Sequence, residues 1–314
     1  MLLGCSIPVV DIGTGPAVVR DYAQAAEGLG YSYLLAPDHV LGANPSADQG
    51  GFSSSAAANA ATFNTDFQRV GTTRNAYHDP FVLFGFLSGC TQKIGFATGV
   101  LILPQRQAVL VAKQAASLDE LCGGRFRLGI GVGWNEIEFN GLNENFHNRG
   151  KRSAEQVRIM QALWAQPHVQ FTGEFHRLDD VGINPRPASG RVPIWFGGHT
   201  DATFRRVASY GDGFMPLIYP PGDAALAAFE KVRALTREAG RNPAKLGIEV
   251  WVSPGVGTED DWRQEVSFWK GAGVTHVTAH TTYISNHHRR ISGSSAADHL
   301  AAITRYRAAV ADLL

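Results

Sequence analysis

IGFATGVLILPQR (residues 94–106) and GRFRLGIGVGW (residues 124–134) flank a stretch of helical periodicity, and together these three parts decide the fold. The first part is apolar and β-branched, which favours a strand. From Ala108 to Leu121 apolar residues recur at helical spacing, and two glycines then end the helix. The nearly continuous apolar run Phe126–Val132 is typical of a parallel strand covered on both faces. The stretch therefore predicts one right-handed βαβ unit.

The same alternation of strand and helix continues along the chain. Further strands are expected at about Gly4–Val10, Tyr31–Ala36, Val192–Phe196, Gly213–Leu217, Leu246–Ser253 and Val274–Ala279. Further helices are expected at Pro16–Gly28, Asp79–Thr91, Arg152–Ala165, Asp201–Tyr210, Asp223–Ala239, Glu259–Gly271 and Ala296–Leu313, with a small hairpin at Val169–Leu178. No composition shift marks a second domain. Eight strand–helix units predict a single α/β domain over residues 1–314, a closed (β/α)8 TIM barrel rather than a doubly wound sheet.

Composition excludes several classes of protein. Lysine plus arginine equals aspartate plus glutamate, 28 of each, so the chain lacks the basic footprint of a nucleic-acid binder. The longest apolar runs have strand length, which predicts no membrane span, and the first residues show no signal peptide. Cys5, Cys90 and Cys122 lie singly in apolar segments and are expected to be buried thiols in a reducing compartment. We therefore expect a cytoplasmic protein.

Residues 42–78 interrupt the pattern. They are rich in alanine, serine, asparagine and glycine and have no sustained period. An irregular loop of this length inside a compact domain is usually functional or mobile. We interpret it as an insertion loop and as a candidate lid over the substrate.

In a closed barrel, the chemistry lies at the carboxyl ends of the strands, so residues that follow the expected strands are candidates for the site. They are His39, Thr98, Gly99, Val100, Gly133, Trp134, Asn135, Gly197, Gly198, His199, Thr200, Pro216 and His280.

The run GIGVG at residues 129–133 is similar to a dinucleotide-binding fingerprint. That fingerprint needs another glycine where this chain has Trp134, and it opens a helix near the first strand of a sheet. Here it follows the fourth strand. We therefore favour a simpler interpretation, in which the glycines keep the barrel mouth uncrowded beside a flat ligand.

The run GGHT at residues 197–200 has two interpretations. Two glycines let the backbone approach a ligand, and the helix that follows offers free N–H groups and a positive dipole end, which together suit a phosphate. Thr200 is also a good N-cap, so the same run is typical of a capped turn with no ligand. The residues alone leave both open.

Histidines at the mouth suggest acid–base chemistry more than metal binding. His39 follows Asp38 at the end of the second strand, where a histidine is a candidate catalyst. His199 and His280 do not form the tight pair on one strand that metal-dependent barrel hydrolases need, so no catalytic metal is predicted. A G-x-S-x-G serine-hydrolase motif is missing from the sequence. The loop that carries Tyr283, His287, His288, Arg289 and Arg290 either binds an acidic group or, as we prefer, is solvated.

Three stretches resemble the luciferase-like monooxygenase family, especially its branch that depends on the deazaflavin coenzyme F420. They are the Asp38–His39 pair, residues 98–135 with the runs TGVLILPQR, AKQAASLD and GRFRLGIGVGWN, and residues 193–216 with PIWFGGHTDA and GDGFMP. Together they cover nearly the whole chain in the family's order.

The resemblance implies a barrel that binds a flavin or deazaflavin at its carboxyl end. It implies a non-proline cis peptide at Gly99–Val100 behind the ring, and His39 near the ring as proton donor or as a shaper of the substrate. Gly197, Gly198, His199 and Thr200 would hold the cofactor phosphate, and Asp38, Thr98, Gly133, Trp134 and Asn135 complete the expected cofactor-binding set. Related sugar-phosphate and alcohol dehydrogenases resemble one another in a tryptophan and a glutamate where this chain has Ala43 and Trp134, so their acid–base arrangement is not expected here.

On this resemblance we expect an oxidoreductase that transfers a hydride between F420 and a small organic substrate. One alternative is an FMN-dependent monooxygenase that uses O₂ and is supplied with reduced flavin by a separate reductase. A second alternative is a barrel that binds the cofactor without catalysis. The resemblance also implies a homodimer, for which the helices at residues 81–87 and 108–121 are the candidate surfaces.

Overall fold

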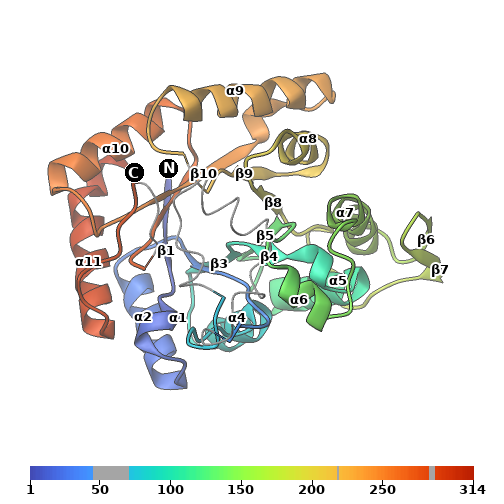
Figure 1. The fold of residues 1–314 in the computed structure, drawn as a ribbon, viewed down its shortest axis with the longest axis horizontal. Helices are drawn as coiled ribbons and strands as arrows, with labels where there is room; N and C mark the ends of the chain where they lie inside the picture. Colours follow the sequence, from blue (N-terminus) through green and yellow to red (C-terminus); the bar gives the residue numbers. More distant parts are fainter. Residues whose placement is uncertain (45–70, 218, 283–286) are drawn as a thin grey trace.

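The strands of the computed structural model pair in the order β3-β2-β1-β11-β10-β9-β8-β5, and β3 pairs back with β5, so the sheet closes on itself. The structure describes residues 1–44, 71–217, 219–282 and 287–314. All pairings within this sheet are parallel. The predicted (β/α)8 barrel is confirmed, and Figure 1 shows its helices arranged around the strands.

The barrel strands are short. They are β1 (Leu2–Ser6), β2 (Tyr33–Ala36), β3 (Gly95–Thr98), β4 (Leu101–Ile102), β5 (Phe126–Gly131), β8 (Ile194–Gly197), β9 (Gly213–Met215), β10 (Gly247–Val252) and β11 (His276–Ala279). Both β3 and β4 pair with β5, so they are two pieces of one barrel strand, interrupted at residues 99–100. The interruption lies at the carboxyl end, where the site was expected.

Helices follow the strands. They are α1 (Val9–Ile12), α2 (Pro16–Gly28), α4 (Pro80–Ser88), α5 (Ala108–Leu121), α6 (Glu136–Gly141), α7 (Arg149–Ala165), α8 (Asp201–Tyr210), α9 (Asp223–Glu238), α10 (Glu259–Gly271) and α11 (Ala296–Ala309). Short 3-10 turns lie at Leu103–Gln105, Pro243–Lys245 and Ala311–Leu313. The expected hairpin is present as β6 (Val169–Thr172) and β7 (Arg177–Val181), and it projects from the side of the barrel in Figure 1.

Two local predictions were wrong, and one short helix was not predicted. The first strand ends at Ser6 rather than Val10, because Pro8 cannot donate to a ladder and the chain turns into α1. The polar stretch after Trp134, for which no helix or strand was predicted, contains the short helix α6. Cys90 is half-buried, whereas Cys5 and Cys122 are buried as expected. Each error involves a segment of only a few residues, for which periodicity carries little information.

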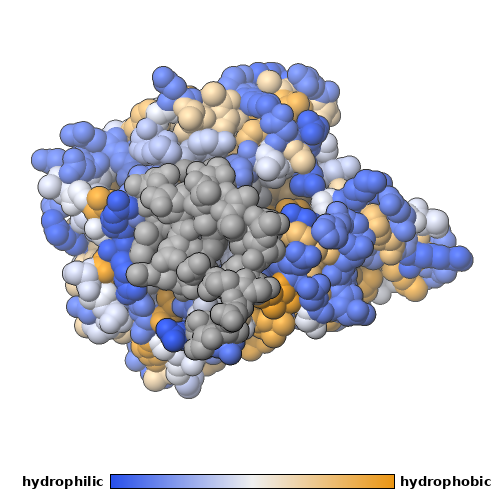
Figure 2. Space-filling view, viewed as in Figure 1, coloured by the Kyte–Doolittle hydropathy of each residue, from blue (hydrophilic) through white to orange (hydrophobic). Residues whose placement is uncertain are grey.

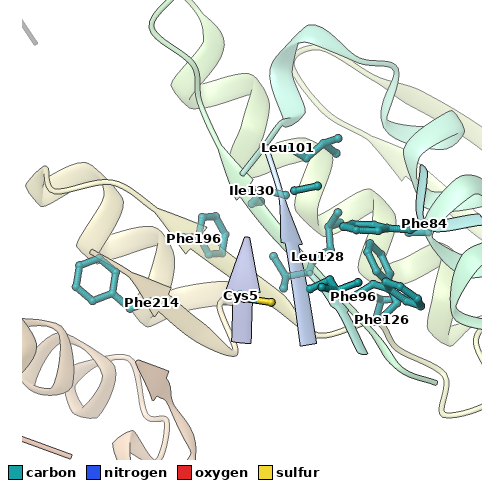
Figure 3. Close-up of a cluster of buried hydrophobic side chains, with 14 of the residues drawn as sticks. Cys5, Phe84, Phe96, Leu101, Phe126, Leu128, Ile130, Phe196 and Phe214 are labelled. Carbon is teal, nitrogen blue, oxygen red and sulfur yellow. The ribbon is translucent and has the colours of Figure 1, made fainter. Parts of the chain in front are cut away.

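The main core lies between the barrel and its helices. Figure 3 shows aromatic side chains of this layer, in which the ring of Phe84 on α4 lies against strand residues Phe96 and Phe126. The ring centroids are 5.1 Å apart for Phe84 and Phe96 and 6.4 Å apart for Phe84 and Phe126. These contacts fix α4 against β3, which ends at the interruption at residues 99–100, and against β5, with which β3 pairs.

A polar cluster fills the barrel near the amino-terminal ends of its strands. The guanidinium carbon of Arg127 lies 4.6 Å from the ring centre of Tyr33 and 4.2 Å from that of Trp195. Arg127 is ion-paired with the buried Glu249, which also accepts a hydrogen bond of 2.6 Å from the hydroxyl of Thr278. The Tyr33 and Thr278 hydroxyl oxygens are 2.8 Å apart. We call these five residues the floor cluster; they close this end of the barrel and leave the carboxyl end for a ligand.

Two glycines make room for the floor cluster. A Cβ on Gly213 or Gly247 would lie 2.1 or 2.2 Å from the indole of Trp195, closer than any side chain can approach. The indole therefore occupies the space that side chains on β9 and β10 would otherwise fill.

The surface mixes residue types. Figure 2 shows hydrophilic and hydrophobic residues interspersed over the visible face, with hydrophilic residues gathered at the tip where the β6–β7 hairpin projects. Among the helices of the described residues, none combines the length and hydrophobicity needed to cross a bilayer.

Candidate functional site

The interruption between β3 and β4 presents Val100 to the barrel mouth. The Gly99–Val100 peptide bond is cis, as the resemblance implied. A Cβ on Gly131 would lie 2.7 Å from one methyl group of Val100, and a Cβ on Gly197 would lie 2.8 Å from the other. The glycines at the ends of β5 and β8 therefore provide the space that Val100 occupies. We call this arrangement, the apolar side chain of Val100 held between Gly131 and Gly197, the Val100 seat.

Asp38 and Arg106 hold this segment in place. One carboxylate oxygen of Asp38 accepts a hydrogen bond of 3.0 Å from the backbone N–H of Ile102, and the other is 2.7 Å from the Arg106 guanidinium. Arg106 also pairs at 2.9 Å with Asp79, whose side chain caps α4. Both oxygens of the buried Asp38 are engaged within the protein, so its carboxylate ties β2 to β4. Its expected contact with a cofactor stays a prediction.

His39 has an acidic neighbour that sequence reasoning missed. Its Nδ1 lies 3.4 Å from a carboxylate oxygen of Glu138 on α6. The same oxygen accepts a hydrogen bond of 2.9 Å from the N–H of Val40, and Gln105 donates to the other oxygen at 3.2 Å. Burial alone would raise the pKa of Glu138, but the contacts with His39 and Gln105 outweigh it and hold that pKa below 4.5. Glu138 is therefore a buried carboxylate at neutral pH.

Aromatic rings surround the imidazole of His39 on its other sides. The ring centres of Tyr77 and Trp134 lie 4.9 Å and 6.2 Å from that of His39. Glu138 lies at ion-pair distance from Nδ1 without a hydrogen bond to it, so the carboxylate acts on the imidazole through its charge while the ring contacts two aromatic side chains. Such a pair can hold a proton and pass it to a group bound at the mouth.

The Gly197–Thr200 run has the geometry of a capped turn. Gly198 has φ of +133°, and a Cβ there would lie 2.8 Å from the hydroxyl of Thr203. Thr200 caps α8 by accepting a hydrogen bond of 3.2 Å from the N–H of Thr203. Burial lowers the pKa of His199, so its imidazole is neutral at neutral pH. Thr200 is therefore the N-cap of α8, as predicted; phosphate binding by the same backbone stays a prediction.

The carboxyl end of β5 carries a buried polar group with no partner. The side chain of Asn135 is 2% exposed, and neither its oxygen nor its nitrogen has a hydrogen-bond partner among the described residues. It neighbours Trp134, and a Cβ on Gly71 would lie within 3.8 Å of its amide nitrogen. The buried hydroxyl of Ser6, at the end of β1, is likewise unpartnered within the described ranges. Together with the Val100 seat, these groups fit a flat ligand that has polar edges.

Two further predicted positions, Thr98 and His280, lie in the packed interior of the protein. Thr98 is fully buried and donates at 2.6 Å to the carbonyl of Gly129, so it joins two strands within the barrel wall. His280 packs on Trp251 with ring centres 4.0 Å apart, and burial lowers its pKa well below 6.5. Both side chains are therefore part of the packed interior.

The eighth loop was expected to be solvated, which is wrong for His288. Its side chain is buried, and its Nε2 lies 2.9 Å from the carbonyl oxygen of Trp251. Tyr283 lies outside the described residues. Within the described ranges, no group of three or more potential ligands is arranged to hold a metal ion.

The two ends of the insertion are joined next to His39. The N–H of Ala43 donates to Gly71 at 2.8 Å, and the N–H of Thr73 donates to Ala43 at 3.0 Å. A small cavity of about 110 Å³ lies between these ends and His39. Residues 45–70 of the predicted loop lie outside the described residues, and its role as a lid stays a prediction.

The fold defines a class of protein: a closed (β/α)8 barrel, in which Val100 and the His39–Glu138 pair lie at the carboxyl ends of the strands. The family model described as luciferase-like monooxygenase matches residues 8–312. The chain therefore belongs to the luciferase-like monooxygenase family, whose members are oxidoreductases and monooxygenases.

Curated relatives point to the same family. An uncharacterised protein from Mycobacterium tuberculosis is 34% identical over 220 residues, 70% of this chain and 71% of the relative. The pyrimidine monooxygenase RutA from Allorhizobium ampelinum is 32% identical over 174 residues, 52% of this chain and 46% of the relative. The FMNH(2)-dependent dimethylsulfone monooxygenase from Pseudomonas fluorescens is 26% identical over 238 residues, 74% of this chain and 56% of the relative.

Solved structures share the fold along the whole chain. An F420-dependent secondary alcohol dehydrogenase, solved with an F420–acetone adduct, superposes with a TM-score of 0.74 at 17% identity and covers 98% of both chains. The F420-dependent tetrahydromethanopterin reductase from Methanopyrus kandleri has a TM-score of 0.69 at 14% identity, with 96% of this chain and 97% of that chain covered. Structural neighbours therefore include F420-dependent enzymes, and the curated relatives include an FMNH(2)-dependent monooxygenase.

Proposed function

We propose that this protein transfers a hydride between coenzyme F420 and a small organic substrate. The observation that carries the proposal is the His39–Glu138 pair at the barrel mouth. Two-electron oxidation or reduction of an organic molecule moves a proton together with the hydride, and a histidine beside a buried carboxylate is suited to that proton. F420, when bound, supplies the hydride-transferring carbon.

The residues around Val100 would hold the flat part of the cofactor. Val100, seated between Gly131 and Gly197, offers an apolar contact to a ring face, and the unpartnered amide of Asn135 offers a donor and an acceptor to a ring edge. The backbone at Gly197–Thr200 and the amino terminus of α8 would receive the phosphate. The rings of Trp134 and Tyr77 beside His39 would limit the access of water to its imidazole.

A second candidate is an FMN-dependent monooxygenase. The names of the relatives at 32% and 26% identity support it, because both are monooxygenases and one is described as FMNH(2)-dependent. The same seat accepts a flavin ring, and reduced FMN would supply the reaction with O₂. In that case a separate reductase would provide the reduced flavin. The third possibility is a barrel that binds the cofactor without catalysing a reaction. The turnover measurements described below test it.

Other features of the proposal concern the assembly and its setting. We propose a homodimer in the cytoplasm that acts on a small molecule and binds neither nucleic acid nor a membrane. Exposed apolar side chains occur on both helices that were predicted to form the dimer contact, among them Val82 and Phe86 on α4 and Val109, Leu110 and Leu121 on α5. Burying these side chains against a second copy would remove apolar surface from water.

Cofactor binding is the direct test. Purified protein is titrated with oxidised and reduced F420 and, separately, with oxidised and reduced FMN, and bound cofactor is followed by fluorescence or absorbance. We expect micromolar binding of F420 and weaker binding of FMN. Micromolar FMN binding without F420 binding would replace this proposal with the monooxygenase.

Substituting His39 distinguishes an enzyme from a protein that only binds the cofactor. With a substrate that turns over, His39→Gln is expected to lower kcat by about 100-fold while cofactor binding stays within a few-fold, since general acid–base groups contribute ~10²–10⁴ in rate. His147→Gln, at a side chain that is 85% exposed, is the matched control. Unchanged turnover in His39→Gln would remove His39 from the mechanism, and no turnover in the wild-type protein with either cofactor would favour the non-catalytic barrel.

A further inference from the structure

Tyr77 lies in the chain segment that leads from the insertion into α4, and this segment is fixed to the barrel on both sides of the tyrosine. On one side, the N–H of Thr73 donates at 3.0 Å to the carbonyl of Ala43, which follows β2. On the other side, Asp79 caps α4 and pairs with Arg106 at 2.9 Å. The tyrosine is therefore held by the framework of the barrel.

The ring of Tyr77 lies beside the imidazole of His39. The two ring centres are 4.9 Å apart, and both side chains line the cavity of about 110 Å³ between His39 and the ends of the insertion. The rest of the lining consists of residues 40–42, residues 71–73 and Asn75. Among the described residues that line this cavity, none is an aspartate, a glutamate, a lysine or an arginine. Within that lining, the imidazole and the phenol are the titratable groups.

The hydroxyl of Tyr77 is available to a ligand. It makes no hydrogen bond to any residue that the structure describes. The hydroxyl of Tyr306 is also unpartnered in the described ranges, but that side chain is fully buried and packs on Trp262. Tyr77 is instead half-buried and lines the cavity, so a molecule bound there can reach its hydroxyl.

The phenol of Tyr77 keeps its proton at neutral pH. Burial, followed by the negative charge of Glu138, raises the pKa of Tyr77 to about 12. A protonated phenol can donate a hydrogen bond to an oxygen. The carboxylate of Glu138, which lies 3.4 Å from Nδ1 of His39, would repel a second anion close to that imidazole. The cavity therefore favours an uncharged oxygen, such as a carbonyl or a hydroxyl, over a carboxylate or a phosphate.

We propose that Tyr77 is a further catalytic residue, whose phenol donates a hydrogen bond to a carbonyl or hydroxyl oxygen of an uncharged substrate in the cavity beside His39. The inference rests on the proposed function for the reaction that this oxygen undergoes. When a hydride is added to a carbonyl carbon, the π electron pair moves to the oxygen, which takes a proton from His39 and becomes a hydroxyl. Tyr77 keeps its own proton and stabilises the negative charge that develops on the oxygen. In the oxidation the steps run in reverse, and His39 accepts the hydroxyl proton.

The first experiment measures turnover in two matched variants. Tyr77→Phe removes the hydroxyl and keeps the ring against His39, and Tyr210→Phe removes a hydroxyl from the last residue of α8, outside the cavity lining. With a substrate that turns over, we expect Tyr77→Phe to lower kcat about 100-fold, as the loss of a donor to a developing oxyanion does, and to leave F420 affinity within about twofold. Tyr210→Phe should change neither quantity. Equal kcat values in the two variants would overturn the role of Tyr77.

The second experiment needs neither cofactor nor turnover. Acetamide and acetate have nearly the same shape, but acetate is an anion. Each compound is titrated into the wild-type protein and both variants, and the NMR signal of the His39 ring is followed. That signal is assigned as the one that His39→Gln loses.

We expect acetamide to shift the His39 signal in the wild type and in Tyr210→Phe. Its binding to Tyr77→Phe should be about fivefold weaker, since one neutral hydrogen bond is lost. Acetate should bind to the wild type about tenfold more weakly than acetamide. No response to acetamide in the wild type, or equal acetamide affinities in the two variants, would contradict the contact with Tyr77. Acetate binding as tight as acetamide binding would contradict an uncharged substrate.

The two experiments separate this inference from the proposed function. If neither F420 nor FMN binds the wild type but acetamide binding depends on Tyr77, the contact with Tyr77 stands and the proposed function fails. If F420 binds and supports turnover while Tyr77→Phe matches Tyr210→Phe in both assays, the proposed function stands and the inference about Tyr77 is wrong.

Discussion

Both ends of the barrel contain buried polar side chains, but the two ends differ in the partners that these side chains find within the chain. At the amino-terminal end, Arg127 is enclosed by two aromatic rings and paired with Glu249, and the hydroxyls of Thr278 and Tyr33 complete the network. At the carboxyl end, the walls are glycines, and the amide of Asn135 finds no partner within the described ranges. In the floor cluster the buried charge of Arg127 has its counter-ion within the chain, although its Nη1 atom has no hydrogen-bond partner in the described ranges, whereas at the mouth we expect a ligand to supply the missing partner of Asn135.

From this difference we infer that the amino-terminal end contributes mainly to folding stability and the carboxyl end mainly to ligand binding. Breaking a satisfied buried ion pair leaves a charge without compensation, which is among the largest costs a single substitution can impose. A substitution at the barrel mouth removes space or contacts that we expect a bound cofactor to use and that contribute little to folding stability. Substitutions at the floor should therefore change unfolding, and those at the mouth should change cofactor affinity.

The largest expected effect is at the floor. Glu249→Ala should lower the free energy of unfolding by about 3–5 kcal/mol, because Arg127 keeps its charge in a buried site without a counter-ion. Denaturant unfolding measures the change. Glu230→Ala, which removes an exposed carboxylate from its pair with Arg237, is the control and should cost less than about 1 kcal/mol. The distinction between the two ends fails if Glu249→Ala costs no more than this control.

A substitution at the mouth should give the reverse pattern. Gly131→Ala puts a methyl group 2.7 Å from Val100, so the seat must shift. We expect cofactor affinity to fall about tenfold or more, while the free energy of unfolding falls by only about 1–3 kcal/mol, as for other overpacked sites. Fluorescence titration and denaturant unfolding give the two values. Gly28→Ala, where a Cβ would meet no atom within 4 Å, should leave both unchanged, and a Gly131→Ala protein with normal affinity would exclude this seat.

The smallest expected effect, when it is taken over a single pH unit, is on the pH dependence of stability. Burial, with the charge of Arg127, lowers the pKa of His276 from 6.5 to about 3. Between these pH values the unfolded chain binds a proton that the folded protein does not, so stability falls as pH falls below 6.5, by up to about 1.4 kcal/mol per pH unit. His276→Gln should flatten the dependence of the unfolding free energy on pH between 6.5 and 4. His147→Gln, at an exposed side chain, should not, and equal slopes for both variants would contradict a buried neutral His276.

Much of the architecture could be predicted because its signals are local and long. The helices at Ala108–Leu121, Asp201–Tyr210 and Glu259–Gly271 begin and end where their sequences predicted. Each has a regular apolar spacing and a clear end signal, and the count of strand–helix units then predicted a closed barrel. The interruption at Gly99–Val100 was predicted only through resemblance, since no spacing rule places it.

The site was less predictable because its contacts join distant parts of the chain. Glu138 reaches His39 from a short helix in a polar stretch for which no helix was predicted, so nothing local connects the two. Arg127 and Glu249 had a weak signal that was overlooked: each is a charged residue inside an otherwise apolar strand. A charge in such a strand implies a partner on the barrel interior, but identifying that partner requires the strand register.

The pairing of Ala43 with residues 71 and 73 has a consequence for how this protein can change. The chain leaves the barrel and returns to it at adjacent backbone positions, Ala43 and Gly71. The entropic cost of closing a loop between two fixed positions grows only with the logarithm of its length. Changing the length of the chain between these two positions should therefore cost the eight-stranded barrel little stability.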